Sequence, residues 1–244
     1  MDLKLNYVMF YTENIREILT DKLTVLTNKL LNGFPVHINL CLPKLFDAEK
    51  MRGFREAYEE VSIHRFQPEN RSFWNSRNLL KYHHYITSMD LDAKGICVGQ
   101  GCVFPGLDSV DPEVWKADVV YASEADLENI SATQHSLTEF LNAIGYEIDT
   151  EEELAYDFRC CYFSQRCKKA LYMRLSEVIE KFHSADDASQ ELAVRYLNDM
   201  ETNILLTLLI SQVREDIPDL TVKSLDINPR GIDNKLVEHF YSIV

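Results

Sequence analysis

The first part of the chain alternates between two hydrophobic patterns, and this alternation restricts the fold more than any other feature of the sequence. Short runs carry apolar residues at every second position, which is typical of β-strands, and the segments between them carry apolar residues at helical spacing. We expect strands at 5–11, 34–42, 61–66 and 85–92, and helices at 15–30, at 47–58 and in a segment that ends near residue 83.

Strands that are separated by helices pair in parallel through right-handed crossovers. The carboxyl ends of such strands share one edge of the sheet, where the ligands of open α/β sheets bind. Gly33 is placed to end the first helix, and Pro43 is placed to end the second strand. We therefore predict an α/β fold whose first half, 1–100, forms a Rossmann-like, mostly parallel sheet.

Residues 101–244 show longer helical patterns and form the helix-rich second half. We expect strands at 117–122, 156–163 and 220–227, and helices at 136–144, 168–183 and 189–213, the last of them apolar around much of its circumference. Gly99, Gly101 and Gly106 are spaced too loosely for a phosphate-binding loop and indicate turns. No repeat or linker divides the sequence, so we predict a single domain over 1–244.

Composition excludes several classes of protein. The 244 residues are 46% hydrophobic, which suffices for a buried core, and their formal net charge of −14 argues against nucleic-acid partners. The amino terminus lacks a leader pattern and no run is long enough for a transmembrane segment, so we expect a soluble, cytoplasmic protein. Such a long, core-rich chain does not need disulfides, and we expect its six cysteines to be mostly reduced.

Asp90 and Asp92 form the only Asp-x-Asp in the sequence and close a segment with few charges. Alternate residues of a strand point to the same side, so both carboxylates can approach one hard divalent cation. A bound cation would also let an acidic protein hold a phosphate-bearing substrate. The alternative is a solvated turn, which is common for acid pairs in a chain with 39 Asp and Glu.

The surroundings of this pair resemble a known family. The segment 77–82, RNLLKY, leads directly into 85–93, YITSMDLDA, between an α/β first half and a helix-rich second half. This layout is similar to that of glycosyltransferases of the GT-A fold, of the Asp-x-Asp type. The resemblance implies that 1–100 is a nucleotide-binding half and that 101–244 lies on the acceptor side. It implies transfer of a hexosyl or related group from a nucleoside diphosphate-sugar to a hydroxyl of a glycan, a lipid-linked acceptor or a protein.

The resemblance also implies roles for individual residues. Asp90 and Asp92 would coordinate Mn²⁺ or Mg²⁺ on the diphosphate, although in the family one of the two commonly contacts the ribose instead. The end of the first strand would meet the base and ribose, through Tyr11, Thr12, Glu13 and Asn14. Arg77 or Lys81 would meet phosphate or the donor sugar, and either is equally well interpreted as an exposed helical charge.

Further candidates lie in the second half. His239 occupies the stretch from which family members present a late His to the metal, and the alternative is a surface His beside an aromatic residue. Asp199 and Glu201 lie where the family has an acid that faces the acceptor or the sugar, but they also suit the first turn of a helix. Asp157 is a third candidate for the base that an inverting enzyme needs. It lies where many members have an Asn-x-Gly segment, which this chain lacks, so the acceptor stays open.

Two other classes of protein remain open from the sequence. A metal-dependent nucleotidyltransferase also holds Mg²⁺ with closely spaced carboxylates, but no glycine-rich signature of that class lies between residues 7 and 18. A non-enzymatic, acidic α/β binding or effector protein would carry the Asp pair as a surface turn. The binding or effector protein differs from the glycosyltransferase and the nucleotidyltransferase in one measurable property, because it should not bind a nucleotide in a metal-dependent manner.

Overall fold

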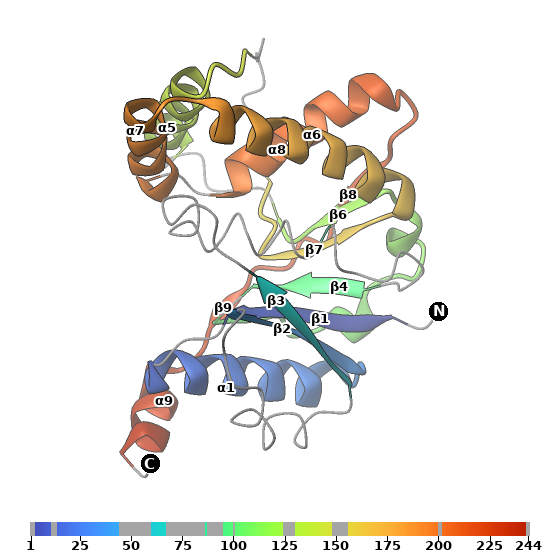
Figure 1. Ribbon diagram of the computed structural model, residues 1–244. Helices are drawn as coiled ribbons and strands as arrows, with labels where there is room; N and C mark the ends of the chain where they lie inside the picture. Colours follow the sequence, from blue (N-terminus) through green and yellow to red (C-terminus); the bar gives the residue numbers. More distant parts are fainter. Residues whose placement is uncertain are drawn as a thin grey trace.

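The computed structural model describes residues 3–10, 14–43, 60–66, 86, 95–99, 101–123, 130–147, 156–199 and 202–242. A seven-stranded sheet runs through the molecule in the order β3-β2-β1-β4-β7-β6-β8 (Figure 1). Its strands are β1 (Lys4–Phe10), β2 (Val36–Pro43), β3 (Glu60–Phe66), β4 (Gly95–Val98), β6 (Val119–Tyr121), β7 (Cys160–Phe163) and β8 (Val222–Ser224). In this sheet every strand but β7 runs in the same direction, which confirms the predicted α/β class with a mostly parallel sheet.

The first helix forms where the sequence predicts it. α1 (Ile15–Asn32) follows β1, and β2 then returns to pair with β1 in parallel. Gly33 ends the helix with a φ of 67°, a left-handed conformation that residues with a Cβ adopt only with strain. Its backbone N–H donates to the carbonyl oxygen of Lys29, which closes the last turn.

The alternating pattern of β2 separates an apolar face from a polar face. Ile38 and Leu40 belong to the apolar cluster that includes Val25 of α1. His37 and Asn39 point to the opposite face, because successive side chains of a strand alternate. There the imidazole Nε2 of His37 lies 2.8 Å from the hydroxyl oxygen of Ser62 on β3, and Asn39 is fully buried. The period of two in the sequence therefore reflects two buried faces of different chemistry.

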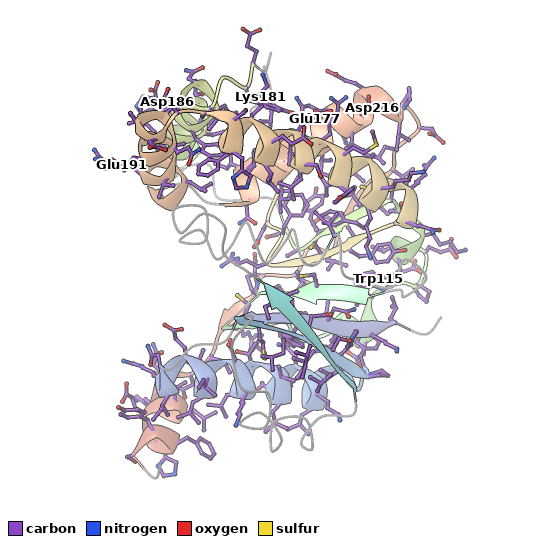
Figure 2. All side chains as sticks on the ribbon, viewed as in Figure 1. Trp115, Glu177, Lys181, Asp186, Glu191 and Asp216 are labelled. Carbon is purple, nitrogen blue, oxygen red and sulfur yellow. The ribbon has the colours of Figure 1, made fainter. Side chains whose placement is uncertain are left out.

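Helices cover both faces of the sheet (Figure 1). α1 lies on one face, where Trp115 packs edge-to-face against Tyr162 with ring centroids 6.2 Å apart (Figure 2). The other face carries α5 (Ile130–Ala143), α6 (Gln165–Ser184), α7 (Asp187–Asp199) and α8 (Thr202–Asp216). Charged residues are exposed on this helical layer, among them Glu177, Lys181, Asp186, Glu191 and Asp216 (Figure 2).

The helix predicted at 189–213 is wrong in its continuity, because the structure contains two helices, α7 and α8. α7 packs against α5 and leaves much of its surface exposed, whereas residues 204–210 of α8 are all buried. A helix packed on one side and a helix packed all round need different positions relative to the sheet. Separating them lets α8 lie in the core beneath α6 while α7 stays beside α5 (Figure 1).

The fourth strand also differs from the prediction. We expected it to end at Asp92, but β4 begins at Gly95, and Ile86 in the predicted strand is helical. β4 pairs with β1 and β7 along its two edges, and apolar clusters cover both of its faces, so all four of its residues are buried. A central strand needs a continuous apolar run. The segment 95–98 supplies one, and of the predicted strand at 85–92 only Ile86 belongs to the described residues.

The predicted helices at 47–58 and ending near residue 83 lie outside the described residues. The predicted elements of the second half form with shifted ends. α5 and α6 both begin earlier than predicted, whereas β6, β7 and β8 are shorter than the predicted strands. Gly101 and Gly106 have φ values of 70° and 88°, which confirms their assignment to turns.

Two buried asparagines of α1 hold the segment that follows β4. The Asn28 amide donates to the carbonyl of Cys102 and accepts from the N–H of Phe104, each at 2.9 Å. Asn32 repeats the pattern one turn later, donating to the carbonyl of Phe104 and accepting from the N–H of Leu107. These amides satisfy backbone groups that would otherwise be buried without partners.

The last described segment returns to the first helix. β9 (Arg230–Gly231) pairs with β5 (Cys102–Val103), and α9 (Asn234–Tyr241) packs against α1. Two short 3₁₀ helices, η2 (Leu107–Ser109) and η3 (Val114–Lys116), connect β5 to β6. Among the helices in the described ranges, none is long and apolar enough to cross a membrane.

All six cysteines carry thiols and none is in a disulfide, which agrees with the expectation that they are mostly reduced. Five are buried, and Cys102 is partly exposed. Cys97 of β4 lies opposite Cys161 of β7 in the antiparallel register. Burial raises the pKa of the Cys41 and Cys167 thiols to about 12, which keeps them protonated.

Replacing Asn28 with Ala should lower the free energy of unfolding by about 2 to 3 kcal/mol, because the N–H of Phe104 and the carbonyl of Cys102 would lose their buried partner. Urea unfolding measures the change. Asn142→Ala, at an exposed position of α5, controls for the change in helix propensity and should cost less than about 0.5 kcal/mol. Equal losses in the two variants would contradict the proposed role of the Asn28 amide.

Candidate functional site

The parallel strands bring their carboxyl ends to one edge of the sheet, where we predicted the site. β1, β4 and β6 end there, and β7 begins there because it runs the opposite way. Several predicted site residues lie outside the described residues: Tyr11, Thr12, Glu13, Arg77, Lys81, Asp90, Asp92 and Glu201. The described part of this edge is formed by the segment before β7 and by its neighbours.

Asp157 and Arg159 form an ion pair just before β7. The Arg159 Nε lies 3.0 Å from each carboxylate oxygen of Asp157, and Nη2 lies 2.7 Å from Oδ2. The backbone N–H of Arg159 also donates to Oδ1, at 2.9 Å. The Asp157 side chain is only 3% exposed, whereas that of Arg159 is 52% exposed. The Arg159 guanidinium is therefore accessible to solvent, whereas the Asp157 carboxylate that binds it is buried.

The backbone around this pair is bound to both neighbouring strands. The N–H of Gly99, at the end of β4, donates to the carbonyl of Arg159 at 2.6 Å. The N–H of Ala122, just after β6, donates to the carbonyl of Asp157, and the N–H of Asp157 donates to the carbonyl of Ser123. A Cβ at Gly99 would lie 3.2 Å from the Arg159 carbonyl oxygen, so a glycine favours this close approach.

The first turns of α8 contact the same segment. The side-chain oxygen of Asn203 accepts the N–H of Phe158, and the hydroxyl of Thr207 accepts the N–H of Tyr156, at 3.1 and 3.0 Å. The rings of Tyr156 and Phe158 pack edge-to-face beneath these bonds. The structure thus brings the start of α8, which the sequence places directly after the candidate Glu201, to the Asp157 segment.

Asp199 is the last residue of α7, and only its backbone is described. Its interpretation as an acid in the first turn of a helix is therefore wrong, because the helix that contains it ends there. A carboxylate at a carboxyl terminus is not favoured by the helix dipole.

Asn14 caps α1 at the carboxyl side of β1. Its Oδ1 accepts the N–H of Arg16 at 3.0 Å, and its Nδ2 lies 3.2 Å from the Glu17 carboxylate. The residue is exposed, and the cap explains its position in the sequence. Binding of base or ribose by this side chain stays a prediction.

His239 lies on α9, which packs against α1. Its side chain is exposed, and its ring packs edge-to-face against Phe240 with centroids 5.8 Å apart. Its neighbour Glu238 forms an ion pair of 2.5 Å with Arg16 of α1. This environment agrees with the alternative interpretation, a surface His beside an aromatic residue. Metal coordination by His239 stays a prediction.

No described part of the chain gathers three His, Cys, Asp or Glu side chains in the manner of a metal centre. The predicted ligands Asp90 and Asp92 lie outside the described residues, so the fit to a metal rests on their chemistry. Two carboxylates supply the hard oxygen ligands that Mg²⁺ and Mn²⁺ bind.

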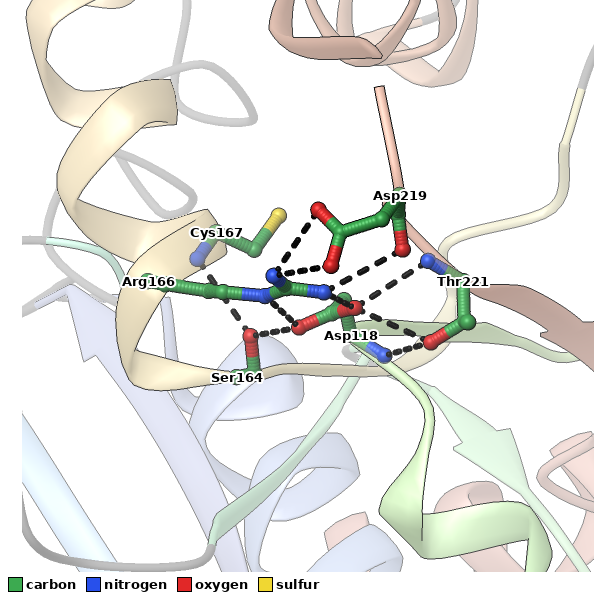
Figure 3. A network of polar contacts seen from close by, with 6 residues as sticks. All are labelled: Asp118, Ser164, Arg166, Cys167, Asp219 and Thr221. Atoms are coloured by element: carbon green, nitrogen blue, oxygen red, sulfur yellow. Dashed lines mark hydrogen bonds and ion pairs between the residues drawn. The ribbon is translucent and has the colours of Figure 1, made fainter. Parts of the chain in front are cut away.

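A second buried carboxylate lies at the opposite edge of the sheet (Figure 3). Asp118, just before β6, accepts from the Nε and Nη2 of Arg166 at 2.6 Å and from the hydroxyl of Ser164 at 2.7 Å. The hydroxyl and backbone N–H of Thr221 also donate to it, and Arg166 continues to the exposed Asp219. This network joins β6, the start of α6 and the segment before β8.

The Arg166 guanidinium holds the pKa of Asp118 well below its usual range, and the bonds from Thr221 and Ser164 act in the same direction. The same contact with Asp118 raises the pKa of Arg166. Because the network lies at the amino ends of the parallel strands, its position indicates a role in stability and not in the predicted site. The sequence analysis did not identify it, since its members are far apart in the chain.

Arg159 was also missed as a functional candidate. The available signal was weak: an acid and a base flank Phe158 just before an apolar run. Only the register of β7 between β4 and β6 shows that the pair lies at the candidate edge.

Comparisons with known proteins give a loose structural likeness. No family model and no curated protein matches the sequence. A structure of galactosyltransferase LgtC with donor and acceptor sugar analogues matches at 10% identity and a TM-score of 0.44, over 80% of this chain and 70% of that chain. Mouse xyloside xylosyltransferase 1 in its apo form matches at 12% identity and a TM-score of 0.45, over 100% and 92%.

A third solved structure belongs to a different enzyme. The 4-diphosphocytidyl-2C-methyl-D-erythritol synthase of Anaerococcus prevotii matches at 12% identity and a TM-score of 0.39, over 98% of this chain and 95% of that chain. The solved structures that this chain resembles therefore include glycosyltransferases and a diphosphocytidyl compound synthase. With TM-scores below 0.5, these likenesses carry no argument about its activity.

Replacing Asp118 with Asn should lower the free energy of unfolding at pH 7 by about 2 kcal/mol, because charge-assisted bonds to a mostly buried carboxylate are lost. The folded-state pKa of Asp118 lies below the unfolded value of about 3.9. The ionised carboxylate therefore stabilises the fold fully above about pH 5, and this contribution is lost as the pH falls toward the folded-state pKa.

Urea unfolding between pH 7 and pH 3 tests this expectation. The difference between wild type and Asp118→Asn should shrink as the pH falls. Asp219→Asn, which removes the exposed partner of the same guanidinium, should cost less than about 1 kcal/mol. A pH-independent difference would show that the Asp118 charge does not stabilise the fold.

Proposed function

We propose that the protein is a metal-dependent glycosyltransferase that moves a sugar from a nucleoside diphosphate-sugar to an acceptor hydroxyl. In this proposal residues 1–244 act as one domain, with the donor bound by the first half and the acceptor by the second. The acceptor is a hydroxyl of a glycan, of a lipid-linked molecule or of a protein. The resemblance around Asp90 and Asp92 is the starting point of the proposal.

The observation that carries the proposal is the meeting of both halves at one sheet edge. The ends of β1 and β4 come from the first half, while the Asp157 segment and the start of α8 come from the second. A transferase that joins a donor to an acceptor needs two substrates side by side, since proximity supplies a large part of the rate enhancement. A sheet edge shared by two halves supports such an arrangement.

A divalent cation fits the charge balance of this chain. The net charge of −14 repels a free diphosphate, so the donor needs local positive charge to bind. Asp90 and Asp92 would hold Mn²⁺ or Mg²⁺, and the metal supplies charge stabilisation for the departing diphosphate. Asp199 or Glu201 would face the acceptor as candidate bases, and Arg77 or Lys81 would meet the donor.

A binding screen tests the donor site. Uridine, guanosine, cytidine and adenosine diphosphates and their common sugar conjugates are each added with Mn²⁺, with Mg²⁺ or with a chelator, and thermal unfolding is followed. A ligand that binds only the native state raises the unfolding temperature. We expect a metal-dependent shift with one base. A folded protein that shifts with no nucleotide under any condition would favour the non-enzymatic binding protein.

Replacing Asp92 with Asn should abolish sugar transfer and leave the unfolding temperature unchanged, because the charge is expected to bind the metal and not to stabilise the core. Transfer is measured by release of nucleoside diphosphate from the donor found in the screen. Asp108→Asn, an exposed residue of η2, is the matched loss of one carboxylate and should retain activity. Wild-type transfer by Asp92→Asn would overturn the assignment of that residue.

A further inference from the structure

Asp157 was predicted as a catalytic base, but its environment suits a different task. A general base needs a carboxylate oxygen within reach of a substrate proton. Both oxygens of Asp157 accept hydrogen bonds from Arg159, and the side chain is 3% exposed. The Asp157 carboxylate is therefore occupied by Arg159, and a substrate proton cannot readily reach it.

Arg159 is held more firmly than an ordinary surface arginine. A long side chain loses rotamer entropy when it binds a ligand, and a guanidinium that is already oriented loses less. Three side-chain contacts with Asp157 fix the plane of the Arg159 guanidinium on its Nε–Nη2 side. Its backbone is fixed as well, by the N–H of Gly99 and by the Oδ1 of Asp157.

The position of this cation matters because the chain is strongly acidic. Arg159 lies at the carboxyl ends of β4 and β6, at the edge where phosphate-bearing ligands of α/β sheets bind. Its side chain is 52% exposed, so its charge is presented to a ligand at that edge. A guanidinium matches phosphate oxygens in geometry and forms charge-assisted bonds that are about twice as strong as neutral ones.

We propose that Arg159 binds the diphosphate of the donor and that Asp157 is the positioning residue that orients Arg159. The proposal rests on the proposed function and adds the group that recognises the phosphates. The ligand class is a nucleoside diphosphate, and the contact is from guanidinium N–H groups to phosphate oxygens. The base for the acceptor hydroxyl then comes from another residue, for which Asp199 and Glu201 are the candidates.

Calorimetric titration of wild type and Arg159→Gln tests the proposal. The probes are the four nucleoside diphosphates, the four corresponding nucleosides and inorganic pyrophosphate, each with Mg²⁺. Loss of the guanidinium should raise the Kd for the bound diphosphate by about 10- to 100-fold, as expected for one or two charge-assisted bonds. The Kd for the nucleoside should not change, because it lacks the phosphates. Arg159→Lys should fall between wild type and Arg159→Gln, since lysine keeps the charge but not the fork of donors.

Asp157→Asn tests the positioning role. This variant should raise the Kd for the diphosphate but not the Kd for the nucleoside. The increase should be smaller than in Arg159→Gln, because the cation remains while its orientation is lost. A purely structural role of Asp157 would raise both Kd values equally. Lys116→Gln, an exposed residue of η3 at the opposite edge, removes one positive charge and should leave both affinities unchanged.

Three results would overturn the inference, and they are distinguishable. If Arg159→Gln binds the diphosphate as wild type does, Arg159 is not the phosphate ligand, although the proposed function stands. If Arg159→Gln weakens diphosphate and nucleoside alike while the circular dichroism spectrum is unchanged, the residue shapes the site without contacting phosphate. If wild type binds no diphosphate, the proposed function fails together with the inference.

Discussion

The antiparallel strand β7 joins the two halves of the molecule, and an aspartate–arginine pair holds it at each end. β7 lies between β4 of the first half and β6 of the second. Asp157 and Arg159 precede it at the carboxyl edge of the parallel strands, whereas Asp118 binds Ser164 and Arg166 just after it at the amino edge. Because β7 is only four residues long, its register depends on these contacts and on the neighbouring strands β4 and β6. The placement of α6 and α8 over the sheet depends in turn on β7.

The two pairs share chemistry but differ in what they present to solvent. In both, the aspartate is almost buried and the arginine is about half exposed. Arg166 continues to a second acid, Asp219, so its charge is balanced within the protein. Asp118 also receives bonds from the backbone N–H and the hydroxyl of Thr221, just before β8. One pair thus connects structural elements, whereas the other lies at the edge where both halves meet.

The sequence predicts much of this fold, for reasons that individual elements make clear. α1 was predictable because its period, its Asn14 cap and its Gly33 terminus agree. The strand at 95–98 was not predicted, because this buried run is short and lies between polar and glycine residues. The break between α7 and α8 depends on which neighbours each helix meets, and no periodicity carries that information. The Asp157–Arg159 pair depends on strand register in the same way, so only the folded chain shows its position.

The two halves of the molecule meet where β4 pairs with β7, a boundary that we call the seam, and buried thiols lie on both of these strands. Cys97 and Cys161 lie opposite each other on β4 and β7, and Cys160, the residue before Cys161, lies on the other face of the sheet. A cysteine thiolate attacks an electrophilic thiol reagent, and these buried sulfurs cannot reach the reagent while the sheet is closed. Their rate of modification in native protein therefore reports how often the seam opens. Slow labelling under excess reagent would describe a molecule in which β4 and β7 stay paired almost all of the time.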